Sequence, residues 1–263
     1  MDYMSPATDS PLTNSSHSTA SIRTAVVTGA SSGIGAATAR RLAAEGFRVY
    51  CIARRTERIT ALASEIGGVA LTCDVTDQAQ VDAMAAALPD RVDVLFNNAG
   101  GAFGQADVEH ADLDEWDAMY RLNVLGTARV TQALLGRVEA AEGSLVFLTS
   151  TAAEYPYVGG AGYCGSKSAE RNIAGAMRLE LGGRPIRVLE ISPGMVKTEE
   201  FSLTRLGSKA DADAVYAGVD APLVAEDIAD CVAWAVTRPA HVNIDRMVVR
   251  PRAQVSNYKV YRG

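Results

Sequence analysis

The sequence has few of the residues that metal centres, disulfide frameworks and membrane spans require. Its four cysteines form no C-x-x-C pair, and its three histidines are isolated and show no metal-ligand spacing. No apolar run approaches the ~20 residues that a membrane-spanning helix needs. We therefore expect no metal site, no membrane association and reduced thiols, and we place the protein in the cytoplasm.

Concentrated charge is also missing. The net charge is −6, charged residues make up 21% of the chain, and no basic stripe is present, so we expect no nucleic-acid partner. The hydrophobic content of 48% is ordinary for a globular protein with a sizeable core. Cys51 and Cys73 lie in apolar runs and are expected to be buried thiols. Cys164 has no histidine near it in sequence to activate it.

The first segment, residues 1–22, differs in composition from the rest. It is rich in Ser, Thr, Pro and Asn and contains few large apolar side chains. Such a segment cannot bury enough surface to offset its ordering entropy, and it lacks the features of a secretory signal. It predicts a disordered tail ahead of one domain at 23–263.

Within that domain, short β-branched runs alternate with Ala/Leu-rich stretches of helical period. Continuous apolar strands separated by helices are typical of an α/β domain with a parallel sheet covered on both faces, the doubly wound Rossmann arrangement. The expected strands are Ala25–Thr28, Arg48–Ile52, Val69–Cys73, Val92–Phe96, Ser144–Thr149, Ile186–Ile191 and Met247–Val249. The expected helices are Ile34–Glu45, Glu57–Ile66, Gln78–Leu88, Glu115–Val138 and Ser166–Leu181.

A glycine-rich turn follows the first strand and precedes a helix. Its spacing is G-x-x-x-G-x-G, which permits a tight turn and a close approach of the backbone to a pyrophosphate at the helix N-terminus. We expect phosphate contacts from Gly29, Ser31, Ser32, Gly33, Ile34 and Gly35.

The second strand ends in Arg54 and Arg55, where an NAD site usually carries an acidic residue for the ribose 2′-hydroxyl. A planar guanidinium suits a 2′-phosphate, so the pair favours NADP(H), although a solvated pair at a helix start is the alternative. Asp74 and Val75 follow the third strand and are placed to meet the adenine. The small residues after the fourth strand, Asn98, Ala99 and Gly100, would let the cofactor lie along the sheet edge.

Tyr163 and Lys167 are four residues apart, so on a helix they lie one turn apart on the same face. There an ammonium can lower the pKa of a phenol, which would then exchange a proton with a carbonyl or alcohol oxygen. Ser150, thirteen residues upstream, is placed to hold that same oxygen. The motif alone is also compatible with a solvated helix face.

The ordered set of motifs resembles the short-chain dehydrogenases/reductases over essentially all of residues 23–250. It comprises Thr28-Gly29…Gly33-Ile34-Gly35, Asn97-Asn98-Ala99-Gly100, Asn123, Ser150, Tyr163…Lys167 and Pro193-Gly194…Thr198. The resemblance implies that Tyr163 is the acid/base and that Ser150 orients the substrate oxygen. Lys167 would lower the phenol's pKa and bind the nicotinamide ribose.

The same resemblance implies three further roles. Asn123 would hold a water in a proton relay to Lys167. Pro193, Gly194 and Val196 would bind the carboxamide, and Thr198 would cap the nicotinamide side. The family often carries a basic NADP-reading residue inside the glycine turn, where this chain has Ser32.

A narrower likeness is to the NADP-dependent 3-hydroxy acid (serine-type) dehydrogenases of that family. It rests on Ala53-Arg54-Arg55, Tyr155–Gly160, Pro193–Glu199 and Pro239–Ile244. These stretches also occur in reductases of other substrates, so a broad carbonyl or aldehyde reductase is the alternative. A non-catalytic NADP sensor is disfavoured, because family members of that kind lose the Tyr or the Lys.

Substrate choice is expected in Thr151–Gly162 and in a mobile lid at residues 199–221, ahead of a C-terminal arm at 251–263. Arg205 is the lid's only arginine and is a candidate partner for a substrate carboxylate. Lys209 and a plain surface role are the alternatives. Tyr157 and Tyr155 are expected to line the pocket or to pack beside Pro156. Family resemblance also implies a homo-oligomer, most often a tetramer, with small residues on two helices available for packing.

Overall fold

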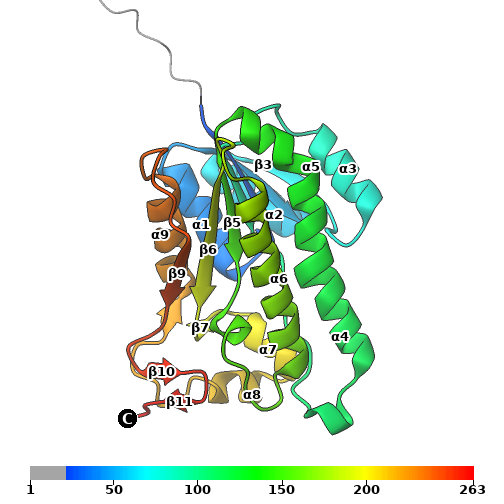
Figure 1. Cartoon of the computed structure of the whole chain (residues 1–263). Helices are drawn as coiled ribbons and strands as arrows, with labels where there is room; N and C mark the ends of the chain where they lie inside the picture. Colours follow the sequence, from blue (N-terminus) through cyan, green and yellow to red (C-terminus); the bar gives the residue numbers. More distant parts are fainter. Residues whose placement is uncertain (1–21) are drawn as a thin grey trace, which may run out of the picture.

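The computed structural model describes residues 22–263, so the predicted tail lies, apart from Ile22, outside the described residues. Figure 1 shows one twisted sheet with helices on both of its faces. All neighbouring strands are parallel, in the order β3-β2-β1-β4-β5-β6-β9. The strands are β1 (Thr24–Thr28), β2 (Arg48–Ala53), β3 (Val69–Thr72), β4 (Val94–Asn97), β5 (Ser144–Leu148), β6 (Arg187–Pro193) and β9 (Arg246–Val249). The predicted doubly wound parallel sheet is therefore confirmed.

Both faces of the sheet are buried under helices. Successive side chains of a strand point to opposite sides, so a single strand can contribute to two core clusters. In β1, Ala25 and Val27 join one core cluster, whereas Val26 between them joins the other. Helices α1 (Gly33–Ala44), α2 (Thr56–Ile66) and α9 (Ala225–Val236) supply the first cluster. Helices α3 (Gln78–Ala86), α5 (Thr127–Ala140) and α6 (Ala161–Glu180) supply the second.

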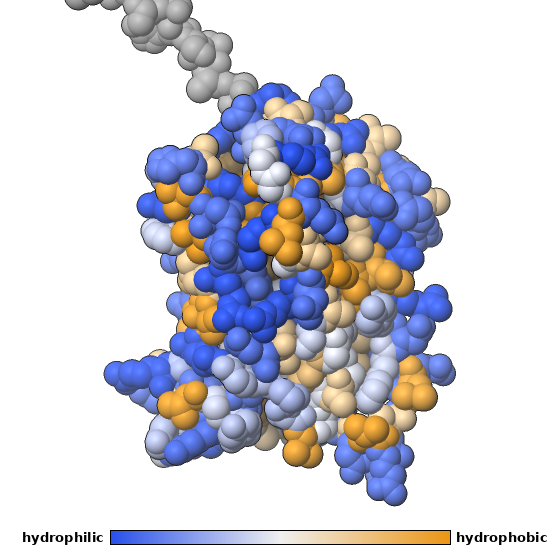
Figure 2. Space-filling model, in the orientation of Figure 1, coloured by the Kyte–Doolittle hydropathy of each residue, from blue (hydrophilic) through white to orange (hydrophobic). Residues whose placement is uncertain are grey.

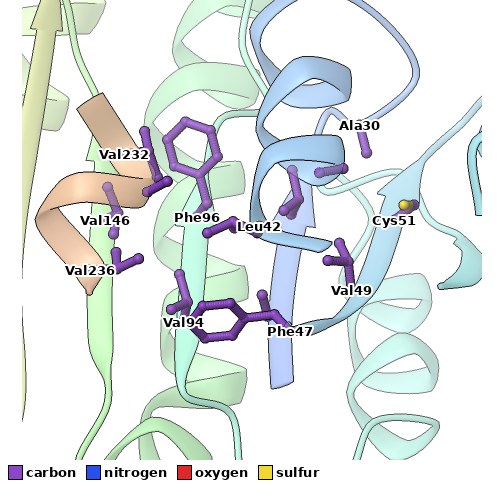
Figure 3. Close-up of a cluster of buried hydrophobic side chains, with 14 of the residues drawn as sticks. Ala30, Leu42, Phe47, Val49, Cys51, Val94, Phe96, Val146, Val232 and Val236 are labelled. Carbon is purple, nitrogen blue, oxygen red and sulfur yellow. The ribbon is translucent and has the colours of Figure 1, made fainter. Parts of the chain in front are cut away.

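The close-up in Figure 3 shows how the first cluster is filled. Phe96 of β4 lies between Leu42 of α1 and Val232 of α9. All three side chains are fully buried. Each such side chain contributes roughly 1.5–3 kcal/mol when it is removed from water, so this layer fixes the two helices on the sheet.

One predicted helix is interrupted. The pattern predicts a single helix over Glu115–Val138, but α4 (Leu113–Tyr120) is followed by a π-helical turn at Arg121–Gly126 before α5 begins. Such turns are rare and are frequent at functional sites. The pattern also places the start of the next helix at Ser166, whereas α6 begins five residues earlier, at Ala161, so Tyr163 lies in its first turn.

The segment between β6 and α9 has more structure than its weak periodicity predicts. Two short helices, α7 (Phe201–Leu206) and α8 (Lys209–Ala214), lie beyond the carboxyl edge of the sheet (Figure 1). The short strands β7 (Val196–Lys197) and β8 (Leu223–Val224) pair at the base of this segment. The C-terminal arm forms the hairpin β10 (Gln254–Ser256) and β11 (Lys259–Val260) at the same end of the molecule. Two 3₁₀ turns, η1 (Val108–His110) and η3 (Thr151–Ala153), complete the elements described.

The surface does not carry an apolar belt on the face drawn in Figure 2. Hydrophobic residues form small groups there, separated by hydrophilic ones. Within residues 22–263, no helix combines the length and the apolar character that crossing a membrane would require.

Candidate active site

A cavity of about 840 Å³ lies at the carboxyl edge of the sheet, between the strand ends and the α7–α8 segment. Its volume falls within the ~300–1,000 Å³ that is usual for small-molecule and cofactor sites. The glycine-rich turn lines one end, and Tyr163 with Lys167 lines the other. Ligands of open parallel sheets bind at this edge.

The glycine-rich turn brings backbone close to backbone. A Cβ atom on Gly35 would lie only 2.3 Å from the carbonyl oxygen of Gly29, so a larger residue does not fit there. Asn98 donates from Nδ2 to the carbonyl oxygens of Thr28, at 2.8 Å, and Gly29, at 3.3 Å. These bonds fix the turn against the end of β4, and the N-terminus of α1 opens into the cavity as an anion-binding site.

The wall after β4 is held by a hydroxyl. Thr28 Oγ1 accepts hydrogen bonds from the backbone N–H groups of Asn98 and Ala99, both at 2.9 Å, and donates to the carbonyl of Phe96. The predicted residues Asn98, Ala99 and Gly100 therefore lie together along one side of the cavity. Asp74 and Val75 line it as well, beside the ends of β2 and β3.

The two predicted NADP-reading arginines have different surroundings. Arg55 donates from Nη2 to Ser31 Oγ and Ser32 Oγ, both at 2.8 Å, so its guanidinium lies against the glycine-rich turn. Its Nη1 lies 2.7 Å from both carboxylate oxygens of Glu200. The Arg54 side chain is 70% exposed, lines the cavity as well, and lies 3.9 Å from the carboxylate of Asp74.

Tyr163 and Lys167 are both buried on α6, one helical turn apart, as predicted. Ser150, which follows β5, lines the same wall, and its hydroxyl lowers the pKa of the Tyr163 phenol. Ser150 Oγ also caps η3 by accepting from the backbone N–H of Ala152 at 3.1 Å. The structure thus brings the predicted Ser, Tyr and Lys to one wall of the cavity.

Burial dominates the electrostatics of this wall, and the lowering of the phenol's pKa by Lys167 stays a prediction. Burial raises the pKa of Tyr163 to about 12, while the Ser150 hydroxyl acts in the opposite direction. Lys167 Nζ donates to the carboxylate of Glu170 at 2.7 Å and to the carbonyl of Leu148 at 2.8 Å. Its charge is therefore balanced by a buried carboxylate, and one of its three N–H donors is left for other partners.

Asn123 lies in the π-helical turn and is fully buried. Its Oδ1 accepts from the backbone N–H of Gly101 at 2.8 Å, and its Nδ2 donates to the carbonyl of Gly101 and to Ser166 Oγ. Both polar groups of the side chain are occupied, so the side chain fastens the loop after β4 to α6. The water relay through Asn123 stays a prediction.

The remaining cofactor residues follow β6. Pro193, Gly194, Val196 and Thr198 all line the cavity. The Thr198 side chain approaches the glycine-rich turn at Gly33 from the opposite side.

On the substrate side, Arg205 of α7 reaches into the cavity. It donates from Nη1 to the hydroxyl of Tyr157 at 2.7 Å and from Nε and Nη2 to the carbonyls of Gly104 and Gly159. Its guanidinium carbon lies 5.8 Å from the ring centroid of Tyr163. Lys209, the alternative cation, is 81% exposed and pairs with Asp213 on the surface.

Two aromatic residues complete this side. Phe201 packs edge-on against Tyr163, with ring centroids 5.7 Å apart. Tyr157 lines the cavity, whereas Tyr155 is half exposed and lies outside it. Cys164 is buried beside Tyr163, and burial raises the pKa of its thiol, which makes it a poor nucleophile.

Comparison with known proteins identifies the family. Residues 23–207 match the family model described as short chain dehydrogenase. The chain belongs to the short-chain dehydrogenase family. It is 56% identical over 236 residues to an uncharacterized oxidoreductase of Mycobacterium tuberculosis, covering 89% of this chain and 93% of the relative. It is 39% identical over 236 residues to an NADP-dependent 3-hydroxy acid dehydrogenase of Salmonella typhi, covering 87% and 95%.

A solved structure of the same family agrees in fold. The closed form of serine dehydrogenase complexed with NADP⁺ superposes with a TM-score of 0.85 at 34% identity, covering 91% of this chain and all of the other. This short-chain dehydrogenase is therefore an oxidoreductase, and the predicted likeness to serine-type and 3-hydroxy acid dehydrogenases is confirmed.

The residues at the cavity of this short-chain dehydrogenase fit a nicotinamide dinucleotide. Because Gly35 has no side chain, the backbone of the turn is accessible to a pyrophosphate. The Arg55 guanidinium beside the turn supplies donors for a further phosphate. Residues 22–263 contain no group of His, Cys, Asp or Glu side chains arranged to hold a metal ion.

Three charged residues of the site were not predicted from the sequence. Glu170 pairs with Lys167, and Glu200 pairs with both Arg55 and Arg58. Arg58 lies one helical turn after Arg55 on α2, a spacing that is visible in the sequence. Glu200 is 145 residues from Arg55, and no local sequence pattern predicts that contact.

Proposed function

We propose that this enzyme transfers a hydride between NADP(H) and a small hydroxy acid or its carbonyl form. When bound, the cofactor supplies the hydride to the carbonyl carbon. Tyr163 gives its proton to the carbonyl oxygen in the reductive direction and takes it back in the oxidative one. Ser150 donates a hydrogen bond to that oxygen, and Lys167 binds the cofactor ribose with its remaining N–H.

The preference for NADP(H) is supported by the rim of the cavity. Arg55 follows β2 and lies against Ser31 and Ser32 of the turn, and Arg58 on α2 reaches the same Glu200 carboxylate as Arg55. A 2′-phosphate would meet at least two guanidinium groups there, and charge-assisted bonds of this kind are the strong ones. The relative that is named NADP-dependent supports the same choice.

The single observation that carries the hydroxy-acid substrate is the position of Arg205. Its guanidinium faces the ring of Tyr163 and is held on three sides by Tyr157, Gly104 and Gly159. A fixed planar cation beside the ring of the acid/base suits a substrate carboxylate.

A broad aldehyde or carbonyl reductase is the second candidate. It is favoured by the same three hydrogen bonds, since they already occupy much of the guanidinium, and by the apolar contact of Phe201 with Tyr163. A neutral carbonyl compound would need no cation at this place.

Arg205→Ala separates the two candidates. A carboxylate contact forms equally in the ground and transition states, so its loss should raise KM for a hydroxy acid by roughly 10–150-fold and leave kcat much less affected. A neutral alcohol of similar size serves as the control substrate. Rapid turnover of neutral aldehydes by an enzyme that ignores 3-hydroxy acids would select the second candidate.

We further propose a homo-oligomer, most often a tetramer in this family, in the cytoplasm. On α6, Ala176 and Leu179 are exposed, and Leu179 is 85% accessible. By contrast, Ala174 is buried in the core and Gly126 packs on Val75, so these two small residues serve the monomer. A mass near 28 kDa by light scattering at micromolar concentration would exclude the oligomer.

A further inference from the structure

Glu200 occupies the arginines at the cofactor rim. Its carboxylate takes both of its hydrogen bonds with Arg55 from the same nitrogen, Nη1, at 2.7 Å, and it accepts another from Arg58 Nη1. Its side chain is 27% exposed, and it lines the cavity together with the glycine-rich turn.

The donors taken by Glu200 are those best placed for a phosphate. Arg55 donates from Nη2 and Nε to the serines of the turn, so Nη1 is the nitrogen that is available to an anion. Arg58 contributes to the described ion pairs only through Glu200. A carboxylate and a phosphate dianion repel each other at one site, so they cannot both be held there.

Glu200 is also the residue directly before α7. The next residue, Phe201, packs on Tyr163, and Arg205 reaches the same ring from the other end of the helix. The contact of Glu200 with α2 therefore ties the start of the predicted lid to the cofactor rim.

We propose that Glu200 is an internal competitor for the 2′-phosphate of NADP(H), which must displace its carboxylate from Arg55 and Arg58 before it can bind. This inference rests on the proposed preference for NADP(H). Glu200 then sets how strongly the enzyme holds the phosphorylated cofactor, and arrival of the phosphate releases the start of α7 from α2. A cofactor without the 2′-phosphate leaves the ion pairs in place.

The test compares Glu200→Gln with Glu199→Gln. Both remove one negative charge from neighbouring positions, but Glu199 is exposed and forms no ion pair with the described residues. Dissociation constants for NADP⁺ and NAD⁺ are measured by isothermal titration calorimetry on the full chain. Partly exposed ion pairs contribute little each, so Glu200→Gln should tighten NADP⁺ by about three- to tenfold and change NAD⁺ less than about twofold. Glu199→Gln should change neither.

The outcomes separate this inference from the proposed cofactor preference. A wild-type enzyme that binds NAD⁺ as tightly as NADP⁺ overturns both. A wild-type enzyme that prefers NADP⁺, with a Glu200→Gln variant that binds it no more tightly or more weakly, overturns the competitor alone. Equal tightening by both variants would reduce the effect to general electrostatics and would also reject it.

Discussion

Two ion pairs, one at the cofactor rim and one beside the catalytic tyrosine, differ sharply in their surroundings. At the cofactor rim, the side chains of Arg55 and Glu200 are 42% and 27% exposed. At the catalytic end, those of Lys167 and Glu170 are 6% and 1% exposed. Both ion pairs have the same N···O distance of 2.7 Å, but the Arg55–Glu200 pair is partly exposed to water and the Lys167–Glu170 pair is buried.

The difference decides what each pair can do. An exposed pair is worth little, because water and salt compete for both charges, so another anion can replace the carboxylate at small cost. A buried pair is hard to separate, because either ion alone would keep its desolvation penalty. The rim is suited to exchange with a ligand, whereas the catalytic end is suited to holding one arrangement.

The largest effect is expected from Tyr163→Phe at the catalytic end. The substitution removes the acid/base and keeps the ring that packs against Phe201, so turnover should fall by at least the ~10²–10⁴-fold assigned to a general acid. NADPH binding, measured by titration of nucleotide fluorescence, should stay near wild type. Substantial turnover by a folded variant would remove Tyr163 from the mechanism.

Next in size is the loss of the buried carboxylate. Glu170→Gln leaves the Lys167 ammonium without its counter-charge, and breaking a buried pair in this way costs about 3–5 kcal/mol of the free energy of unfolding. Urea denaturation, followed by circular dichroism, measures this cost. Glu200→Gln is the matched control, because the same change at the rim should cost only about 0.2–1 kcal/mol. Equal losses in the two variants would abolish the contrast between the pairs.

A smaller effect, on binding alone, is expected from Arg55→Ala. Charge-assisted hydrogen bonds to the 2′-phosphate are worth about 1.5–3 kcal/mol each, so NADPH affinity should fall by roughly 10–150-fold. Arg54→Ala should lower it much less, since that side chain is 70% exposed and its guanidinium lies 3.9 Å from Asp74. NADH affinity should barely move in either variant, and a wild-type preference for NADH would refute the assignment.

The smallest signal is the shape of the pH profile. With its pKa raised to about 12 by burial, Tyr163 keeps its proton across the neutral and mildly alkaline range. Carbonyl reduction needs the protonated phenol, so its kcat/KM should stay level to at least about pH 10, the ordinary pKa of tyrosine. Alcohol oxidation needs the phenolate and should still be rising with pH over the same range.

Glu170→Gln tests how far this pH profile depends on the buried carboxylate. Without the buried carboxylate, the Lys167 charge acts on the phenol undiminished and should move the alkaline fall of the reductive profile to lower pH. A wild-type fall centred near neutral pH would show instead that Lys167 already controls Tyr163 despite its pairing with Glu170.

Local motifs made much of this site predictable. The glycine-rich turn and the Tyr163–Lys167 pair each depend on residues close in sequence, and a parallel sheet brings the strand ends to one edge. For the same reason Asn98 and Ser150 were placed correctly on the cavity wall. The positions of these residues follow from the path of the backbone, which the hydrophobic pattern of the sequence predicts well.

The contacts that set the charges were not predictable in this way. Glu170 is three residues from Lys167, but the sequence does not show that both side chains are buried together. The contact of Glu200 with Arg55 joins segments 145 residues apart and depends on where the α7 segment folds back. That Lys167 lowers the pKa of Tyr163 stays a prediction, and the sequence does not show the burial and the buried partner of Lys167 that act in the opposite direction.

The π-helical turn at Arg121–Gly126 amounts to one extra residue in an otherwise regular helix. Each α-helical residue turns the chain by about 100°, so deleting a single residue from this turn would join α4 and α5 into one uninterrupted helix with a new register. Asn123 would then rotate away from Gly101 and Ser166, although no residue touching either had been replaced. The length of this helix, counted to a single residue, is therefore as much a condition of the active site as the identity of its side chains.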